Sequence, residues 1–236
     1  MVPAFLALSL LTLGSVAPQQ PLGTLPPILQ PQLRDGQQFR YQMIFAIRDP
    51  QMSSRLDNSF SVVVTDQPGQ PLRWIQHYMG GPRTGMDVAF SISPDGFLIS
   101  QKTNAPSAEA SFLYNRALFG DPPTNLAVGT KWQNWIKATN PLGPPFGFLN
   151  VEVTSVDASQ GLVELRFVYK LNARIRYPED HGDPTYSSHD VSDATGTATF
   201  NGGIMTSLVA TTSNAHDMPN GRRMFFDSTV TMSLAQ

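Results

Sequence analysis

Residues 162–177 read LVELRFVYKLNARIRY and alternate between apolar and polar side chains almost without a break. Their odd positions carry Val163, Leu165, Phe167, Tyr169, Leu171, Ala173, Ile175 and Tyr177. From Glu164 to Arg176 the even positions are polar except for Val168. A period of two is typical of a β-strand with one buried face. At about 3.3 Å per residue the strand would be roughly 53 Å long, so it must curve or twist, as strands in barrels and half-barrels do.

Shorter alternating stretches lie on both sides of this strand. The first begins at Gln37, where Phe39, Tyr41, Met43, Phe45 and Ile47 share a face. Further strands are expected at 59–65, 72–79, 86–92, 97–101, 130–138, 148–157, 195–200, 204–213 and 223–234. One helix is expected at 107–119, where Ala108, Phe112 and Phe119 share a face. The pattern predicts a mainly β fold: a curved antiparallel sheet, as a half-barrel or barrel-like sandwich, with one packed helix.

The composition of the 236 residues excludes several classes of protein. Lys and Arg total 16 against 18 Asp and Glu, a net charge of −2, so no broad basic surface for nucleic acid is expected. Apolar residues make up 41% and charged residues only 14%, which favours a folded core over a disordered chain. There is no Cys, which excludes disulfides, thiolate metal sites and Cys nucleophiles.

The N-terminal residues predict export. Residues 4–16 form an apolar run too short to span a bilayer, and Ser15-Val16-Ala17 has the small-x-small form of a cleavage site. We therefore expect a signal peptide over 1–17, a Pro-rich linker over 18–35 and a single β-rich domain over 36–236. A bacterial protein is favoured, soluble in the periplasm or outside the cell, with no integral membrane segment once the signal is removed.

Local catalytic motifs such as G-x-S-x-G, a Walker loop or H-E-x-x-H do not occur. The segment 179–193 is rich in carboxylates and imidazoles, and its candidate ligands for a divalent cation are His181, Asp183, His189 and Asp190. The alternative is a solvated loop of turn-forming residues between two strands. His216-Asp217, expected in a turn, leaves a hydrolase open, but nothing selects a nucleophile. No catalytic residue is assigned, and an enzyme is the less favoured hypothesis.

The apolar faces can line a ligand cavity in a curved sheet. The candidate ligand-binding residues are Phe39, Tyr41, Met43, Phe45, Leu165, Phe167, Tyr169 and Ile175. A closed, fully packed core fits the same pattern. The first alternative predicts an exported, non-enzymatic protein that holds an apolar small molecule or lipid in its concave face. The second predicts a structural or interaction module of the cell envelope, with a filled core and a protein partner.

Two further patterns concern the outer surface. Trp132 and Trp135 are three residues apart on an expected strand, so one should face the core and the other outward. The even face of 162–177 carries a basic stripe of Arg166, Lys170, Arg174 and Arg176. Such a stripe can meet anionic lipid headgroups, or it can simply keep a surface strand soluble.

Three short motifs resemble those of uncharacterised exported β-rich bacterial domains: Asp35-Gly36-x-x-Phe39-x-Tyr41, Val128-Gly129-Thr130-x-Trp132 and Gly196-x-Ala198-x-Phe200. The order of long curved strands with a helix inserted midway is also similar to the half-barrel of lipoprotein carriers such as LolA and LppX. This resemblance implies transient binding of acyl chains or of a lipoprotein in the concave face. It assigns no individual site residue.

Overall fold

The computed structural model describes residues 25–48, 53–66, 72–81, 84–92, 98–101, 114, 119–136, 146–176, 187–217 and 221–235. Eleven strands make up most of these residues. They are β1 (Gln38–Arg48), β2 (Ser53–Thr65), β3 (Leu72–Gly80), β4 (Asp87–Ile92), β5 (Leu98–Gln101), β6 (Lys131–Ile136), β7 (Phe146–Asp157), β8 (Leu162–Arg176), β9 (Ser187–Asn201), β10 (Ile204–Asp217) and β11 (Arg223–Ala235). A short 3-10 turn, η1 (Pro27–Leu29), precedes them. Within these ranges no helix is long and apolar enough to cross a membrane.

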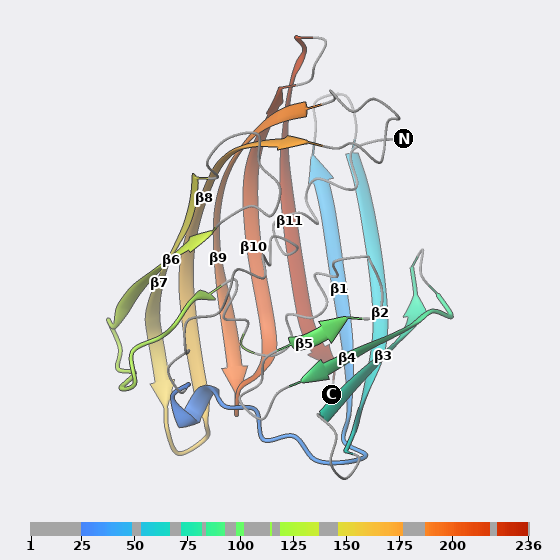
Figure 1. The fold of residues 1–236 in the computed structure, drawn as a ribbon, viewed down its shortest axis with the longest axis vertical. Helices are drawn as coiled ribbons and strands as arrows, with labels where there is room; N and C mark the ends of the chain where they lie inside the picture. The colour runs from blue at the N-terminus through green and yellow to red at the C-terminus, as the bar shows by residue number, and fades with distance from the viewer. Residues whose placement is uncertain are drawn as a thin grey trace.

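All the strands belong to one antiparallel sheet in the order β5-β4-β3-β2-β1-β11-β10-β9-β8-β7-β6. The first and last strands lie side by side in the middle of the sheet, with Arg40 opposite Ala235. The two edges are β5 and β6, which are consecutive along the chain. Figure 1 shows that the sheet bends, so that its two edges flank a concave face. The predicted fold class, a curved antiparallel sheet, is therefore confirmed.

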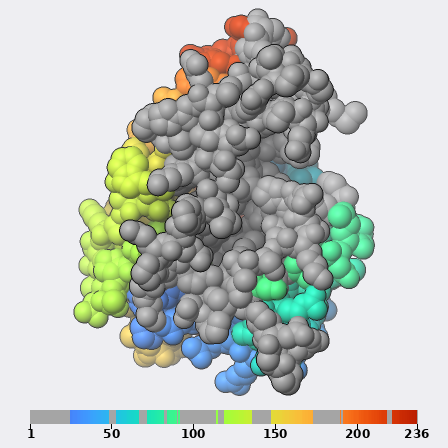
Figure 2. Space-filling model, viewed as in Figure 1, coloured from blue at the N-terminus to red at the C-terminus, as the bar shows by residue number. Residues whose placement is uncertain are grey.

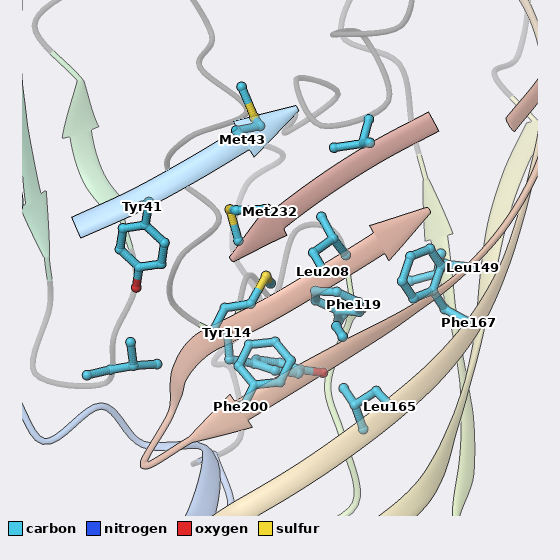
Figure 3. Packing of buried hydrophobic residues seen from close by; sticks show 14 of the residues in the cluster. Tyr41, Met43, Tyr114, Phe119, Leu149, Leu165, Phe167, Phe200, Leu208 and Met232 are labelled. Atoms are coloured by element: carbon cyan, nitrogen blue, oxygen red, sulfur yellow. The ribbon is translucent and has the colours of Figure 1, made fainter. Parts of the chain in front are cut away.

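The core lies on the concave face and is built from alternate residues of every long strand. One row across the sheet consists of Val153, Leu165, Ala198, Leu208, Met232 and Met43, each paired with the next across a ladder. All six are buried. Figure 3 shows side chains of this kind from β1, β7, β8, β9, β10 and β11 gathered on the same side of the sheet. Alternation in the sequence thus identified the inward face correctly.

Tight turns connect several strands. Gly202 and Gly203 form the whole link between β9 and β10, with φ of 54° and 75°. Positive φ at both positions matches the right-handed twist of a two-residue hairpin, and only glycine adopts it without strain. Between β7 and β8, the Asp157 carboxylate accepts hydrogen bonds from the backbone N–H groups of Ser159 and Gln160. The two strands expected at 148–157 and 162–177 therefore form an antiparallel hairpin.

Three strands are clearly longer than expected. β2 begins at Ser53 rather than at 59, and the differences in β9 and β10 concern candidate site residues. β9 begins at Ser187 rather than at 195, so residues 187–193 are a strand and not a solvated loop. β10 continues to Asp217, which places His216 in a strand rather than in a turn. The inward positions of these extensions include Ser192 and Asn214, which are polar. The apolar alternation is lost in these extensions, so the sequence pattern does not predict a strand there. Pairing with the neighbouring strands on both sides forms the strand instead.

The end of the expected linker is part of the core. Leu25 and Leu29 are 2% and 0% exposed, and η1 packs against β8 and β9. Gly203 makes room for this segment, since a Cβ there would lie 2.5 Å from the Leu29 carbonyl oxygen. Repeated prolines exclude a long helix or a ladder, but they allow a short 3-10 turn with buried leucines. Residues 25–30 of the expected linker are therefore packed against the sheet. The expected helix at 107–119 lies outside the described residues except for Tyr114 and Phe119.

Candidate functional site: the concave face

The predicted ligand-binding residues share the concave face. Phe39 is partly buried, while Tyr41, Met43, Phe45, Leu165, Phe167 and Tyr169 are buried. The side chain of Ile175 lies outside the described residues. On the β1–β3 side, the rings of Tyr41 and Phe60 stack with centroids 5.5 Å apart, and Phe39 stacks on Trp74 at the same separation. Burial raises the pKa of the Tyr41 hydroxyl, so this ring stays neutral at any physiological pH.

On the β8–β9 side, two aromatic residues from the segment between β5 and β6 fill the concave face. The ring of Phe119 lies 5.8 Å from Phe167 and 5.9 Å from Phe200. Tyr114 lies beside them and donates a hydrogen bond from its hydroxyl to the Gly120 carbonyl. Figure 3 shows Tyr114 and Phe119 on the same side of the sheet as Phe167 and Phe200. This part of the face is a packed core.

Trp132, on the edge strand β6, is bonded to the segment that contains Tyr114 and Phe119. Its indole N–H donates a hydrogen bond of 2.6 Å to the Phe119 carbonyl. Trp132 packs against the core, whereas Trp135 is 63% exposed and meets only the edge of Phe148 among the rings described, at 6.0 Å. The prediction that the two tryptophans face opposite sides is confirmed. In Figure 2 the residues of β6 (yellow-green) lie at one side of the viewed face, opposite those of β3 and β4.

A polar strip crosses the inward face of β9, β10 and β11. It consists of the buried residues Ser192, Thr212, Asn214, His216 and Ser228. The Ser192 hydroxyl donates to Asn214 Oδ1 at 2.8 Å, and Asn214 Nδ2 lies 3.4 Å from both the Phe226 carbonyl and Ser228 Oγ. The Asn214 amide is thus bonded through both its oxygen and its nitrogen. We interpret the strip as a hydrogen-bonded link between three strands.

A second buried amide lies at the other side of the concave face. Gln76 on β3 is 0% exposed, and its neighbours across the ladders are Val62 and Val88. Neither its Oε1 nor its Nε2 has a hydrogen-bond partner in the described part of the chain. Sequence reasoning missed Gln76, although its even spacing with Trp74 and Tyr78 on an expected strand was a signal that it faces inward.

The candidate hydrolase pair is not brought together. His216 faces inward and Asp217, the next residue of the strand, faces the other side. Asp217 instead contacts His189, whose Nδ1 is 3.2 Å from Asp217 Oδ2 and whose Nε2 is 2.6 Å from Asn172 Oδ1. Arg223 donates two hydrogen bonds to the same carboxylate and, together with His189, lowers the pKa of Asp217 to about 2. These four outer-face side chains join β8, β9, β10 and β11.

The expected metal site is mostly outside the described residues. His181 and Asp183 lie there, as does the side chain of Asp190. His189 has both ring nitrogens next to side-chain oxygens. Among the described residues, no three His, Cys, Asp or Glu side chains gather around a common point. A divalent cation bound by the four predicted residues stays a prediction.

The basic stripe on the outer face of β8 is balanced by carboxylates where it is described. Arg166 donates to Glu152 at 2.6 Å, and this bond lowers the pKa of Glu152. Lys131 lies 3.8 Å from the same carboxylate, and Lys170 lies 3.6 Å from Asp193. The side chains of Arg174 and Arg176 are outside the described residues. At Arg166 and Lys170 the arrangement favours a soluble surface over a site for anions.

These observations leave the concave face as the strongest candidate site. It combines a large curved apolar surface, a packed aromatic region near β8 and β9, and a buried amide on β3. Function has to be inferred from this geometry, since no family model matches the chain and no curated protein or solved structure is significantly similar to it.

Proposed function

We propose that this protein is an exported, non-enzymatic binding protein that holds an apolar ligand or lipid in the concave face of its sheet. The observation that carries the proposal is the shape of the sheet together with its lining. β5 and β6 are unpaired edges in the described sheet, and the inward side chains between them are apolar over many strands. A curved apolar surface of this size binds apolar molecules wherever the chain itself leaves room.

Two further features support the same function. Met43, Met205 and Met232 lie in the buried cluster, and flexible thioether side chains adapt to ligands of varied shape. The apolar N-terminal run supports export, as does the resemblance to half-barrel lipoprotein carriers. The proposal assigns no catalytic residue and no cofactor.

Native mass spectrometry of the protein, exported from a bacterial host and purified gently, tests the proposal. We expect extra mass that disappears under denaturing conditions and behaves as lipid. Leu208→Phe places a larger ring on the inward face, and Val209→Phe places the same ring one residue later on the outer face. Ligand should decrease in the first variant and persist in the second. A bare polypeptide mass for the unmodified protein, or equal ligand in both variants, would contradict the proposal.

A second candidate function is an interaction module of the cell envelope with a filled core. Tyr114, Phe119 and Leu29 already fill part of the concave face, which favours this alternative. The exposed Trp135 on the edge strand β6 offers an apolar contact for a protein partner. Under this alternative the protein carries no lipid. Trp135→Ser should then weaken the recovery of a partner by cross-linking, and both proteins should show only their polypeptide mass in native mass spectrometry.

A further inference from the structure

Gln76 is the side chain on the concave face that the fold explains least. It lies between Trp74 and Tyr78 on the inward side of β3 and is completely buried. The residues opposite it on β2 and β4 are valines, which offer no hydrogen bond from their side chains. Its amide oxygen and nitrogen therefore stay without a hydrogen-bond partner in the described structure.

An unbonded buried amide lowers stability, because water bonds both of its polar atoms in the unfolded chain. Leucine would fill nearly the same space without this cost. Asn214 provides a comparison within the same sheet, since its buried amide is bonded through both oxygen and nitrogen. The fold can therefore supply hydrogen bonds to an inward-facing amide. Because Gln76 has none, we expect its partner to come from outside the described chain.

We propose that Gln76 is the polar contact of the concave-face site and binds an uncharged ligand group that both donates and accepts hydrogen bonds. The occupant that fits best is a long-chain carboxamide, whose N–H and C=O match the Oε1 and Nε2 of Gln76. Its apolar chain would lie against Phe39, Val62 and Trp74. This inference rests on the proposed function and deepens it by naming the ligand's polar group.

The surroundings of Gln76 favour a neutral ligand over a fatty-acid anion. Among the described residues, the buried polar side chains are Asn58, Gln76, Ser192, Thr212, Asn214, His216 and Ser228, so none is Asp, Glu, Lys or Arg. A carboxylate placed beside Gln76 would be buried without an opposite charge, which costs much more than burying an amide.

Titration of the delipidated full chain with dodecanamide tests the inference, with methyl dodecanoate as a probe that only accepts hydrogen bonds. The unmodified protein should bind the amide more tightly than the ester. Gln76→Leu should weaken amide binding about tenfold or more and make the two probes nearly equal. Gln76→Met keeps an unbranched side chain of similar length, and its affinities for the two probes should match those of Gln76→Leu. Gln42→Leu makes the same change at an exposed position of β1 and should alter neither affinity.

The ligand-free proteins provide an independent measurement. Gln76→Leu should unfold at a higher denaturant concentration than the unmodified chain, because it removes the unbonded amide. Amide binding that is unchanged in both Gln76 variants would overturn the inference and leave the proposed function standing. A loss of stability in both ligand-free variants would also overturn it, since the amide would then have a structural role. Failure of the unmodified protein to bind either probe would overturn the proposed function together with this inference.

Discussion

Single residues on the concave face are matched in size to their neighbours across the sheet. Gly196 lies on β9 between Phe167 of β8 and Ala210 of β10. A Cβ at Gly196 would collide with the Phe167 ring and would lie 2.5 Å from the Val209 carbonyl oxygen. A glycine normally weakens a strand, because it adds conformational entropy to the unfolded chain and has no side chain to pack. Here it leaves room for the Phe167 ring to lie close to the backbone of β9.

Gly196→Ala should therefore destabilise the protein by about 1–3 kcal/mol, the usual cost of inserting a methyl group into a well-packed core. The free energy of unfolding in urea measures the effect. Gly80→Ala is the matched control, since its new Cβ would mainly meet the hydroxyl of Ser59, which can rotate away. Equal stability of the two variants would show that Phe167 moves aside at little cost.

At the scale of strands, one outer-face network ties together four neighbouring elements. Asn172, His189, Asp217 and Arg223 come from β8, β9, β10 and β11, and each contacts the next. The pKa of Asp217 falls from its ordinary value of 3.8 to about 2, chiefly because Arg223 donates hydrogen bonds to its carboxylate. A carboxyl group with a lowered pKa in the folded state stabilises the fold while it is ionised, and this contribution is lost as pH falls.

Asp217→Asn should therefore be less stable than the unmodified protein at neutral pH. The difference should shrink as the pH falls from about 4 towards 2, where the native carboxylate is protonated as well. Urea unfolding at a series of pH values measures it. In an Arg223→Met background, most of this pH-dependent difference should disappear. A difference of constant size down to about pH 2 would mean that Asp217 acts through its shape rather than its charge.

Strands could be predicted from the sequence wherever one face is apolar. In β1 and β8 the alternation determined both the strand and its inward face. It was insufficient at 187–194 and at His216, because the inward side chains there are polar, and Ser192 and Asn214 form hydrogen bonds with each other and with Ser228 across neighbouring strands. The same limit applies to the site. Periodicity identifies the apolar lining, but whether Asn214 or Gln76 finds a hydrogen-bond partner depends on which strands become neighbours.

At the scale of the whole molecule, the pairing of β1 with β11 controls which parts of the sheet are most protected. These strands lie at the centre of the sheet, while β5 and β6 lie at its edges. Hydrogen exchange followed by mass spectrometry should therefore show slow exchange in β1 and β11, close to that of β8 and β9, and fast exchange in β5 and β6. Early exchange in β1 and β11 would show that the two halves of the sheet open along their common boundary.

Because Arg40 lies opposite Ala235, the end of β11 lies beside the start of β1, and a peptide that leads into a retained segment 25–37 could join them. If the link between β5 and β6 were cut at the same time, the chain would run from β6 to β11 and then from β1 to β5. Every ladder of the native sheet would then join consecutive strands. Such a circular permutant would keep the same sheet with a much lower average contact order, and it should form that sheet faster. The arrangement of these strands in space is thus separable from the order in which the gene encodes them.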